Sequence, residues 1–219
     1  RVKPADVAGV TAQCDVVFLA VKPQDMSALI ASIPQENLKG PLYISIAAGR
    51  TLTWLEGQMP GARVVRVMPN LAVTAGLGAS AFCIGAKARK ADAKLASKLL
   101  NCTGKAIQVA EDRMDAVTAL SGSGPAFISY FMQAMIDAGV ELGLSEADST
   151  TLGLQTLLGT AAVLSAGESS VADFIKAVTS AKGTTAAGLE VLEKSSIRTI
   201  AKRTLAAAAR RSKELGKLP

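Results

Sequence analysis

Hydrophobic and polar positions in the first half of the chain alternate between two patterns. Short runs rich in β-branched and aliphatic residues occupy 15–21, 42–46, 63–68, 79–84 and 106–109. Amphipathic patterns with helical spacing lie between several of these runs, at 23–33, 52–58 and 91–100. This alternation is typical of βαβ units and of a parallel sheet that is buried on both faces.

The second half of the chain carries helical patterns only. Helices are expected at residues 112–120, 125–143, 146–166, 171–178, 184–193 and 196–214. The sequence therefore predicts an α/β fold followed by an all-α region. We expect a doubly wound, Rossmann-type parallel sheet over residues 1–110 and a helical domain over residues 111–219.

Composition limits the chemistry that is open to this chain. Its 219 residues include no histidine, which excludes His-based triads, imidazole acid–base catalysis and the usual zinc sites, so no metal site is expected. Three cysteines, Cys14, Cys83 and Cys102, lie in apolar surroundings without C-x-x-C spacing. They predict buried, reduced thiols in a cytoplasmic protein.

Charge and hydropathy indicate whether the chain binds nucleic acid or a membrane. The net charge is +6, but aromatic residues make up only 4% and the most basic run is the single helix 196–214, which argues against nucleic acid. Residues 116–136 and 149–167 are uncharged over lengths that could span a membrane. The first stretch contains the helix-breaking sequence 121–125 and the second is rich in Thr, Ser and Gly, so both are expected at a protein interface rather than in a membrane.

Small or polar residues follow each of the first three predicted strands, where an open parallel sheet binds its ligands. They are Val21, Lys22 and Pro23, then Ala48 and Gly49, then Asn70. Any one of these segments is typical of an ordinary βα turn. Three in succession favour a cofactor-binding edge.

Two further segments look special. Residues 121–125, Ser-Gly-Ser-Gly-Pro, predict a tight elbow between two helices, with Pro125 in the first turn of the second. Ser180, Gly183, Thr184 and Thr185 precede or open another helix, whose free N–H groups and hydroxyls would suit a small carboxylate or phosphate. Helix capping accounts for the second segment equally well, although two threonines exceed what one cap needs.

Segments 18–24, 45–49, 66–70, 115–126 and 178–189 together closely resemble pyrroline-5-carboxylate reductases, in the same order and spacing over the whole chain. The family's opening βα unit, with its G-x-G-x-x-G phosphate loop, is expected to precede residue 1. The resemblance implies reduction of 1-pyrroline-5-carboxylate to L-proline, the last step of proline biosynthesis, with NADPH or NADH as hydride donor. It also implies a homodimer formed through the C-terminal helices, which in the family are often grouped into decamers.

Site residues follow from the resemblance by position. The cofactor edge comprises Val21, Lys22, Pro23, Ala48 and Gly49, with Asn70 as a further candidate. The substrate carboxylate is assigned to Ser180 and the amides of Gly183, Thr184 and Thr185, and the ring nitrogen to the catalytic hydroxyl of Thr185. Glu111 resembles a residue that lines the same pocket, but it equally fits an acid that stabilises a helix start.

This chain departs from the family pattern at one point of the substrate loop. Where the family has Ser-Pro-Gly-Gly or Ser-Lys-Gly-Gly, residues 180–183 read Ser-Ala-Lys-Gly, so Lys182 stands in place of a glycine. Two other interpretations stay open. One is a non-catalytic dimeric homologue or fragment that no longer binds dinucleotide, and the other is a different imino-acid or hydroxy-acid dehydrogenase of related fold.

Overall fold

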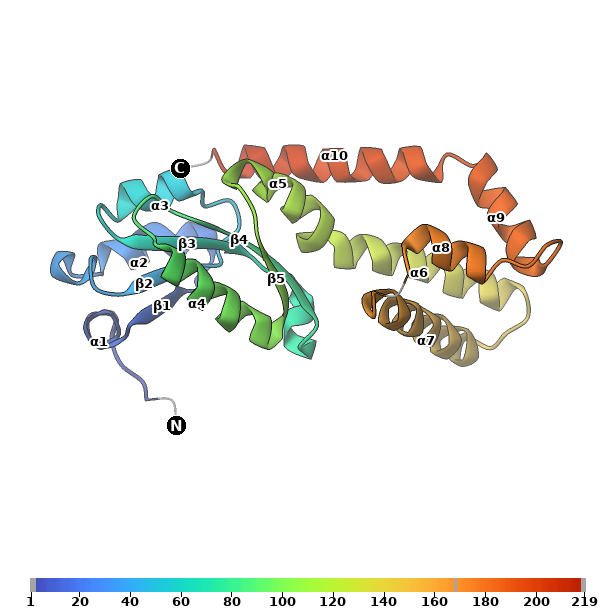
Figure 1. Ribbon diagram of the computed structural model, residues 1–219, viewed down its shortest axis with the longest axis horizontal. Helices are drawn as coiled ribbons and strands as arrows, with labels where there is room; N and C mark the ends of the chain where they lie inside the picture. The colour runs from blue at the N-terminus through green and yellow to red at the C-terminus, as the bar shows by residue number, and fades with distance from the viewer. Residues whose placement is uncertain (1–2, 168, 218–219) are drawn as a thin grey trace. The chain divides into compact units, whose positions relative to one another are not determined.

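The computed structural model describes residues 3–167 and 169–217 (Figure 1). The chain divides into two compact units. The sheet unit comprises residues 1–125 and 205–219, and the helical unit comprises residues 126–204. Residues 111–125 belong to the sheet unit because Met114 is part of its buried core and Val117 packs against that core. The predicted domain limit between residues 110 and 111 stays a prediction.

In the described part of the chain, five strands form one sheet in the order β1-β2-β3-β4-β5. They are Val16–Leu19, Leu42–Ser45, Arg63–Met68, Gly78–Ile84 and Gly104–Gln108. Strands β1, β2 and β3 are parallel, as are β4 and β5. The predicted α/β, Rossmann-type class is confirmed.

One strand pair departs from the predicted parallel arrangement, because β3 and β4 run antiparallel. The connection between them, residues 69–77, holds only the 3₁₀ turn η3 (Leu71–Ala75). A parallel crossover needs a dozen or more residues, usually with a helix. The chain between these strands is too short for that crossover and can only turn back.

Helices cover the sheet because alternate strand residues are apolar on both faces. In β2, Tyr43 belongs to one buried cluster, whereas Leu42 and Ile44 belong to the other. The sheet unit's helical segments are α1 (Val7–Gln13), η1 (Pro23–Asp25), α2 (Met26–Ala31), η2 (Gln35–Asn37), α3 (Leu52–Gln58), α4 (Lys90–Leu100), η4 (Asn101–Thr103), η5 (Glu111–Arg113) and α5 (Met114–Val117). Helix α1 was not predicted. Its seven residues lack a clear apolar stripe, and Asp6 caps it by accepting a hydrogen bond from Gly9 N at 2.7 Å.

Two helical segments meet at residues 121–125, as predicted, and Pro125 lies in the first turn of the second. The first segment extends further than predicted, because the chain passes from α5 into a stretch of π-helix, η6 (Thr118–Gly122), and only Ser123 separates η6 from α6, which begins at Gly124. A side chain at position 122 would collide with Met68 at the end of β3. Glycine there lets the widened turn lie against the sheet, and a π-bulge, rather than a break, absorbs the Ser-Gly-Ser-Gly sequence.

Long helices dominate the rest of the chain. They are α6 (Gly124–Glu141), α7 (Glu146–Ser165), α8 (Val171–Ala177), α9 (Thr184–Lys194) and α10 (Ile197–Leu215). Ser145 caps α7 by accepting from Asp148 N at 3.1 Å, and the buried Ser149 hydroxyl donates to the Ile136 carbonyl of α6 at 2.7 Å. Within the described ranges, none of the helices has the length and apolar character needed to cross a membrane.

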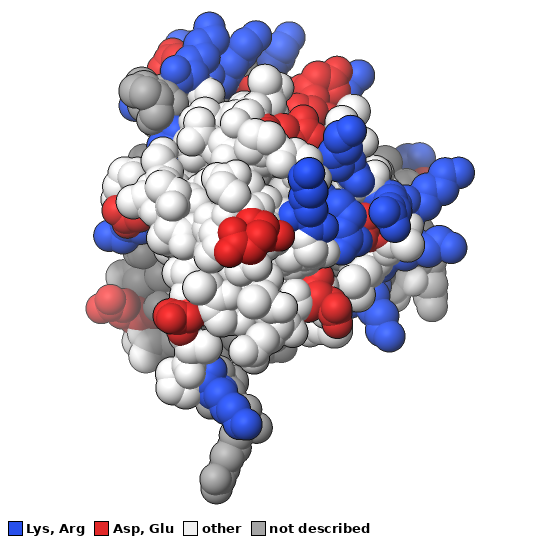
Figure 2. All heavy atoms as spheres, turned by 90° about the vertical axis from the view of Figure 1, so that its left-hand side faces the viewer, with Lys and Arg blue, Asp and Glu red and all other residues white. Residues whose placement is uncertain are grey.

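Cysteine placement corrects one expectation. Cys83 is buried as predicted, but Cys14 and Cys102 are exposed, and all three are free thiols. Cys14 follows the end of α1 and Cys102 lies in η4, and both are polar surface turns. On the face of the molecule in Figure 2, uncharged residues cover much of the left and centre, and Lys and Arg gather at the top and on the right.

Candidate active site

The first group of predicted site residues lies at one edge of the sheet. Strands β1, β2 and β3 are parallel and in register, so their carboxyl ends meet there. The residues directly beyond these ends include Val21, Lys22, Pro23, Ala48, Gly49 and Asn70. Lys22 and Ala48 are exposed and the other four are half-buried, so a ligand can reach every one of them. The sheet therefore brings the predicted cofactor edge together.

Gly49 is required by the backbone. Its φ of 75° lies in the left-handed region, and a Cβ there would stand 3.4 Å from the carbonyl of Leu215 near the end of α10. That conformation is strained for any residue with a side chain. Gly49 thus lets the β2 loop turn sharply beneath the C-terminal helix.

Asn70 has a structural task in addition to its predicted one. Its Oδ1 atom accepts a hydrogen bond from the Ala79 N–H at 3.1 Å. The bond links the loop after β3 to the start of β4, and it leaves the amide NH₂ of Asn70 free to donate.

Arg50 joins two loops of this edge and was not predicted from the sequence. Its guanidinium donates to the Pro23 carbonyl from Nε at 3.0 Å and from Nη2 at 2.8 Å. The same guanidinium lies over the ring of Trp54, 4.5 Å from the ring centre. The two bonds to Pro23 span 27 residues of sequence, so no local pattern predicts them.

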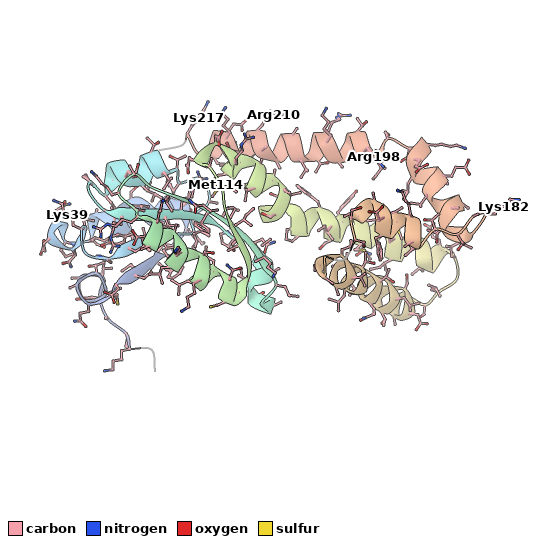
Figure 3. All side chains as sticks on the ribbon, viewed as in Figure 1. Lys39, Met114, Lys182, Arg198, Arg210 and Lys217 are labelled. Carbon is pink, nitrogen blue, oxygen red and sulfur yellow. The ribbon has the colours of Figure 1, made fainter. Side chains whose placement is uncertain are left out.

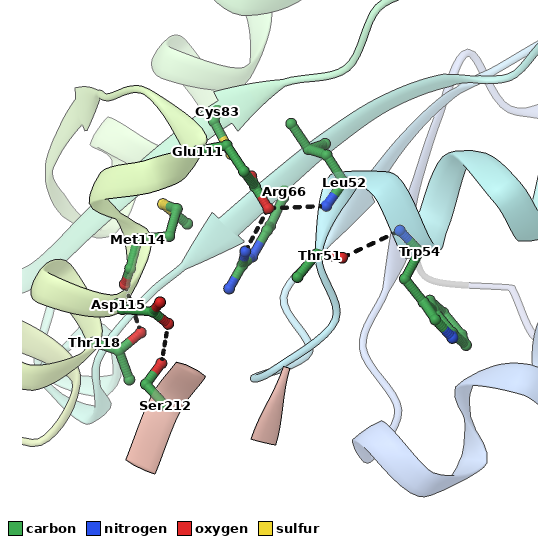
Figure 4. A network of polar contacts seen from close by, with 10 residues as sticks. All are labelled: Thr51, Leu52, Trp54, Arg66, Cys83, Glu111, Met114, Asp115, Thr118 and Ser212. Carbon is green, nitrogen blue, oxygen red and sulfur yellow. Dashed lines mark hydrogen bonds and ion pairs between the residues drawn. The ribbon is translucent and has the colours of Figure 1, made fainter. Parts of the chain in front are cut away.

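Glu111 is held in a network within the sheet unit (Figure 4). Its Oε1 atom accepts from Arg66 Nη1 at 2.6 Å and from the Leu52 N–H at 3.0 Å. Leu52 is the first residue of α3, which Thr51 caps by accepting from Trp54 N at 3.1 Å. Glu111 is thus an acid at a helix start twice over: it is the first residue of η5, and its carboxylate accepts from the first N–H of α3.

Cys83 completes the network. Its thiol donates to Oε2 of Glu111 at 2.7 Å. Burial raises the pKa of the Cys83 thiol, and the hydrogen bond to the Glu111 carboxylate and its negative charge raise it further. The thiol is thus protonated and unreactive at neutral pH. Both Glu111 oxygens have partners inside the sheet unit, and its predicted contact with substrate stays a prediction.

The second group of predicted residues gathers at the start of α9 in the helical unit. Gly183 is the N-cap of α9, and its Cα lies so close to the Ser180 hydroxyl that a Cβ atom at position 183 would collide with it. Ser180, Thr184 and Thr185 are exposed, and within the described chain none of the three hydroxyls has a hydrogen-bond partner. The first N–H groups of α9 and these hydroxyls together form a cluster of donors that suits a carboxylate.

Lys182 stands at the position where the resemblance predicts a glycine. It has a φ of 60° and is the one non-glycine residue with positive φ in the described chain. Its side chain extends away from the loop between α8 and α9 (Figure 3). A left-handed conformation costs a residue with Cβ about 1 kcal/mol, and the loop accepts this cost at Lys182.

The residues present fit a dinucleotide at the carboxyl edge of the sheet. Three successive loops expose small or polar groups there, and Gly49 keeps one of them compact. In contrast, no group of three Cys, Asp or Glu residues in the described parts of the chain could hold a metal ion.

Fold and edge together define an α/β protein of the dinucleotide-binding type with a helical C-terminal region. A family model described as pyrroline-5-carboxylate reductase dimerisation matches residues 111–215. A model described as NADP oxidoreductase, coenzyme F420-dependent, matches residues 1–49.

Individual relatives agree with these matches. The pyrroline-5-carboxylate reductase of Methanosarcina acetivorans is 41% identical over 97% of this chain and 79% of that protein. The solved structure of the Coxiella burnetii enzyme has a TM-score of 0.94 at 34% identity, covering 98% of this chain and 81% of the other. The Plasmodium falciparum enzyme, solved with NADP bound, has a TM-score of 0.85 at 32% identity, covering 98% and 82%. The chain belongs to the pyrroline-5-carboxylate reductase family.

Proposed function

We infer that this protein reduces 1-pyrroline-5-carboxylate to L-proline with NADPH as the electron donor. The observation that carries the inference is the match to reductases of this name over nearly the whole chain, at 41% identity to the relative from Methanosarcina acetivorans. In the reaction, hydride adds to the imine carbon, a proton goes to the ring nitrogen, and NADPH becomes NADP⁺. The two other interpretations, a non-catalytic homologue and a different dehydrogenase, have no comparable support.

Substrate binding is assigned to the start of α9. The carboxylate would accept from the amides of Gly183, Thr184 and Thr185 and from the Ser180 hydroxyl, aided by the positive end of the helix dipole. Support comes from the absence of intramolecular partners for these hydroxyls in the described residues. Fixing a small cyclic anion in this way orients its ring for attack from one face.

Thr185 is assigned the catalytic position. Its hydroxyl would donate to the ring nitrogen, whose electron density rises as the carbon accepts hydride, so the bond strengthens in the transition state. No histidine is needed, which agrees with a chain that has none. When bound, the nicotinamide supplies the hydride. Val21, Lys22, Pro23, Ala48, Gly49 and Asn70 are the residues that would hold the dinucleotide.

The test is the rate of NADPH oxidation with pyrroline-5-carboxylate, measured for the unchanged protein and for Thr185→Val and Thr185→Ser. Loss of the hydroxyl in Thr185→Val should lower kcat about 100-fold, as expected for a donor in the transition state. Thr185→Ser keeps the hydroxyl and should recover most of the rate. Thr53→Val, an exposed change within α3, serves as the matched control. A folded protein without turnover would overturn the function, and equal rates for Thr185→Val and the control would overturn the role of Thr185.

Self-association accompanies the activity. The dimerisation model covers residues 111–215, and we propose a homodimer through the C-terminal helices, with five dimers grouped as a decamer. We also place the protein in the cytoplasm, because its three cysteines are free and two of them are exposed. Light-scattering mass tests the assembly, and a monomer at micromolar concentration would contradict it.

A further inference from the structure

The strongest unassigned feature is the Arg50 side chain between two loops of the sheet edge. Arg50 is only 7% exposed, so its guanidinium is not a surface group available to bind a phosphate directly. Two of its N–H donors converge on a single acceptor, the Pro23 carbonyl, at 3.0 and 2.8 Å. A charged donor pair on one buried carbonyl is stronger than a neutral hydrogen bond and leaves little freedom for either loop.

The position of this contact gives it functional meaning. Pro23 lies in the loop after β1 with Val21 and Lys22, and Arg50 directly follows Ala48 and Gly49 in the loop after β2. The Arg50 guanidinium therefore ties together the two segments that were assigned to the cofactor, while its own charge faces Trp54 at 4.5 Å.

On the Arg50 side of the Arg50–Pro23 contact, neighbouring residues fix the backbone. Thr51 caps α3, the Leu52 N–H is bound by Glu111, and Gly49 packs on Leu215. In contrast, the Pro23 end lies in the 3₁₀ turn η1, which leads directly into the six-residue helix α2. In this turn the Met26 N–H donates to the Pro23 carbonyl and the Asp25 N–H donates to the Lys22 carbonyl at 2.9 Å, and no side chain caps its start. Helix ends fray when they lack a cap, so the Arg50 contact is a substantial part of what fixes this turn.

Resting on the proposed function, we propose that Arg50 is a positioning residue for the dinucleotide. It acts through the Pro23 carbonyl and holds the β1 loop in its binding conformation before the ligand arrives. Preorganised loops lose less conformational entropy on binding, so the contact raises affinity without touching the ligand. Lysine cannot replace it, because an ammonium group lacks the planar fork that reaches one carbonyl twice and stacks on an indole.

The first experiment is hydrogen exchange on the nucleotide-free protein. In Arg50→Met and Arg50→Lys, the amides of Asp25 and Met26 should exchange about tenfold faster, since the turn loses its anchor. Trp54 is the only tryptophan of the chain, so its emission should shift in the same variants and report the lost stacking.

The second experiment measures NADPH binding by calorimetry, together with steady-state kinetics. The Kd and KM for NADPH should rise about tenfold in both variants, with kcat and the KM for pyrroline-5-carboxylate little changed. Arg63→Met is the matched control. Arg63 also donates to a backbone carbonyl, that of Gly40 at 2.9 Å, and it forms an ion pair with Asp92. However, it is the first residue of β3 and so lies at the amino end of the strand, away from the cofactor edge.

Unchanged NADPH affinity and unchanged exchange at Asp25 and Met26 would overturn the proposal, even if the variants melt at lower temperature. Equal loss of NADPH affinity in Arg63→Met would also overturn it, because general destabilisation would then account for the effect. If Arg50→Met does not fold, Arg50→Lys, which keeps the charge and the aliphatic stem, decides the matter. Failure of the proposed function is distinct, since it appears as absent turnover in the unchanged protein.

Discussion

Apolar side chains are distributed in opposite ways in the two units. The sheet unit has a core of buried hydrophobic residues, among which Tyr43, Leu55 and Val64 have no exposed surface. In the described part of the helical unit, Ile136 is the only buried hydrophobic residue, at 9% exposure, whereas Leu142 is 88% exposed. One unit closes its own core, and the other presents helices whose apolar surface requires a partner.

A groove between α6 and α7 is the surface of the helical unit where we expect such a partner. It has a volume of about 530 Å³, and apolar and polar residues line it in equal number: Met132, Ile136, Val140, Leu154 and Leu157, with Ser129, Gln133, Asp137, Glu146 and Thr150. The groove lies inside residues 111–215, which match the dimerisation model. A second copy of the chain would remove this surface from water, which is the driving force for stable association.

The largest expected effect comes from placing a charge in this groove. Leu154→Asp should weaken self-association at least about 100-fold, because a carboxylate would have to be buried without a partner. Sedimentation velocity over a range of protein concentrations measures the effect. Leu77→Asp, a change at a 70%-exposed position of the sheet unit, is the control and should leave the mass of the assembly unchanged. An assembly of wild-type mass in Leu154→Asp would place the interface elsewhere.

The contrast between the units also explains how far sequence reasoning could go. All five strands were predicted from their apolar runs, and in most of them these runs serve a core within the same chain, as Leu42, Tyr43 and Ile44 illustrate. The helices of the second half were predicted equally well from their spacing. The antiparallel β3–β4 pair was missed, because the loop length between these strands, rather than their hydrophobic pattern, determines their direction.

The site residues also fall into those that a local pattern predicts and those that it does not. Residues beyond the strand ends were predicted from local sequence, and the structure brings them to one edge; their contact with the cofactor stays a prediction. Arg50, Arg66 and Cys83 were not recognised, because their partners lie 27, 45 and 28 residues away. Such contacts exist only after the sheet has formed. Pairing across this distance cannot be inferred from residue type or periodicity.

Glu111→Gln tests whether the sheet unit depends on its internal network, with an intermediate expected effect. The amide keeps an acceptor for the Leu52 N–H but leaves the buried Arg66 guanidinium without a negative partner. Because the Glu111 side chain is one-third exposed, the expected loss in free energy of unfolding is about 2 kcal/mol, less than for a fully buried pair. Denaturant titration at constant protein concentration measures it.

The neighbouring Asp112→Asn is the control for this change. Asp112 is exposed and lies 3.7 Å from Arg113, so its loss should alter the free energy of unfolding by less than about 0.5 kcal/mol. The predicted contact of Glu111 with substrate adds a second measurement. A raised KM for pyrroline-5-carboxylate in Glu111→Gln would support that contact, whereas an unchanged KM would restrict Glu111 to bracing α3. Equal stability of the two variants would show that the network adds nothing.

Lys182→Gly has the smallest expected effect and tests the helical unit at its strained point. Lys182 has a φ of 60°, so glycine should relieve about 1 kcal/mol of backbone strain, partly offset by the greater freedom of glycine in the unfolded chain. The free energy of unfolding should therefore rise by about 0.5 kcal/mol. Lys202→Gly, within α10, makes the same chemical change at a helical position and should lower it by about 1 kcal/mol. Opposite signs for the two variants would show that backbone conformation at residue 182, and not loss of a lysine, determines the result. A decrease for both would mean that the loop before α9 tolerates Lys182 without strain.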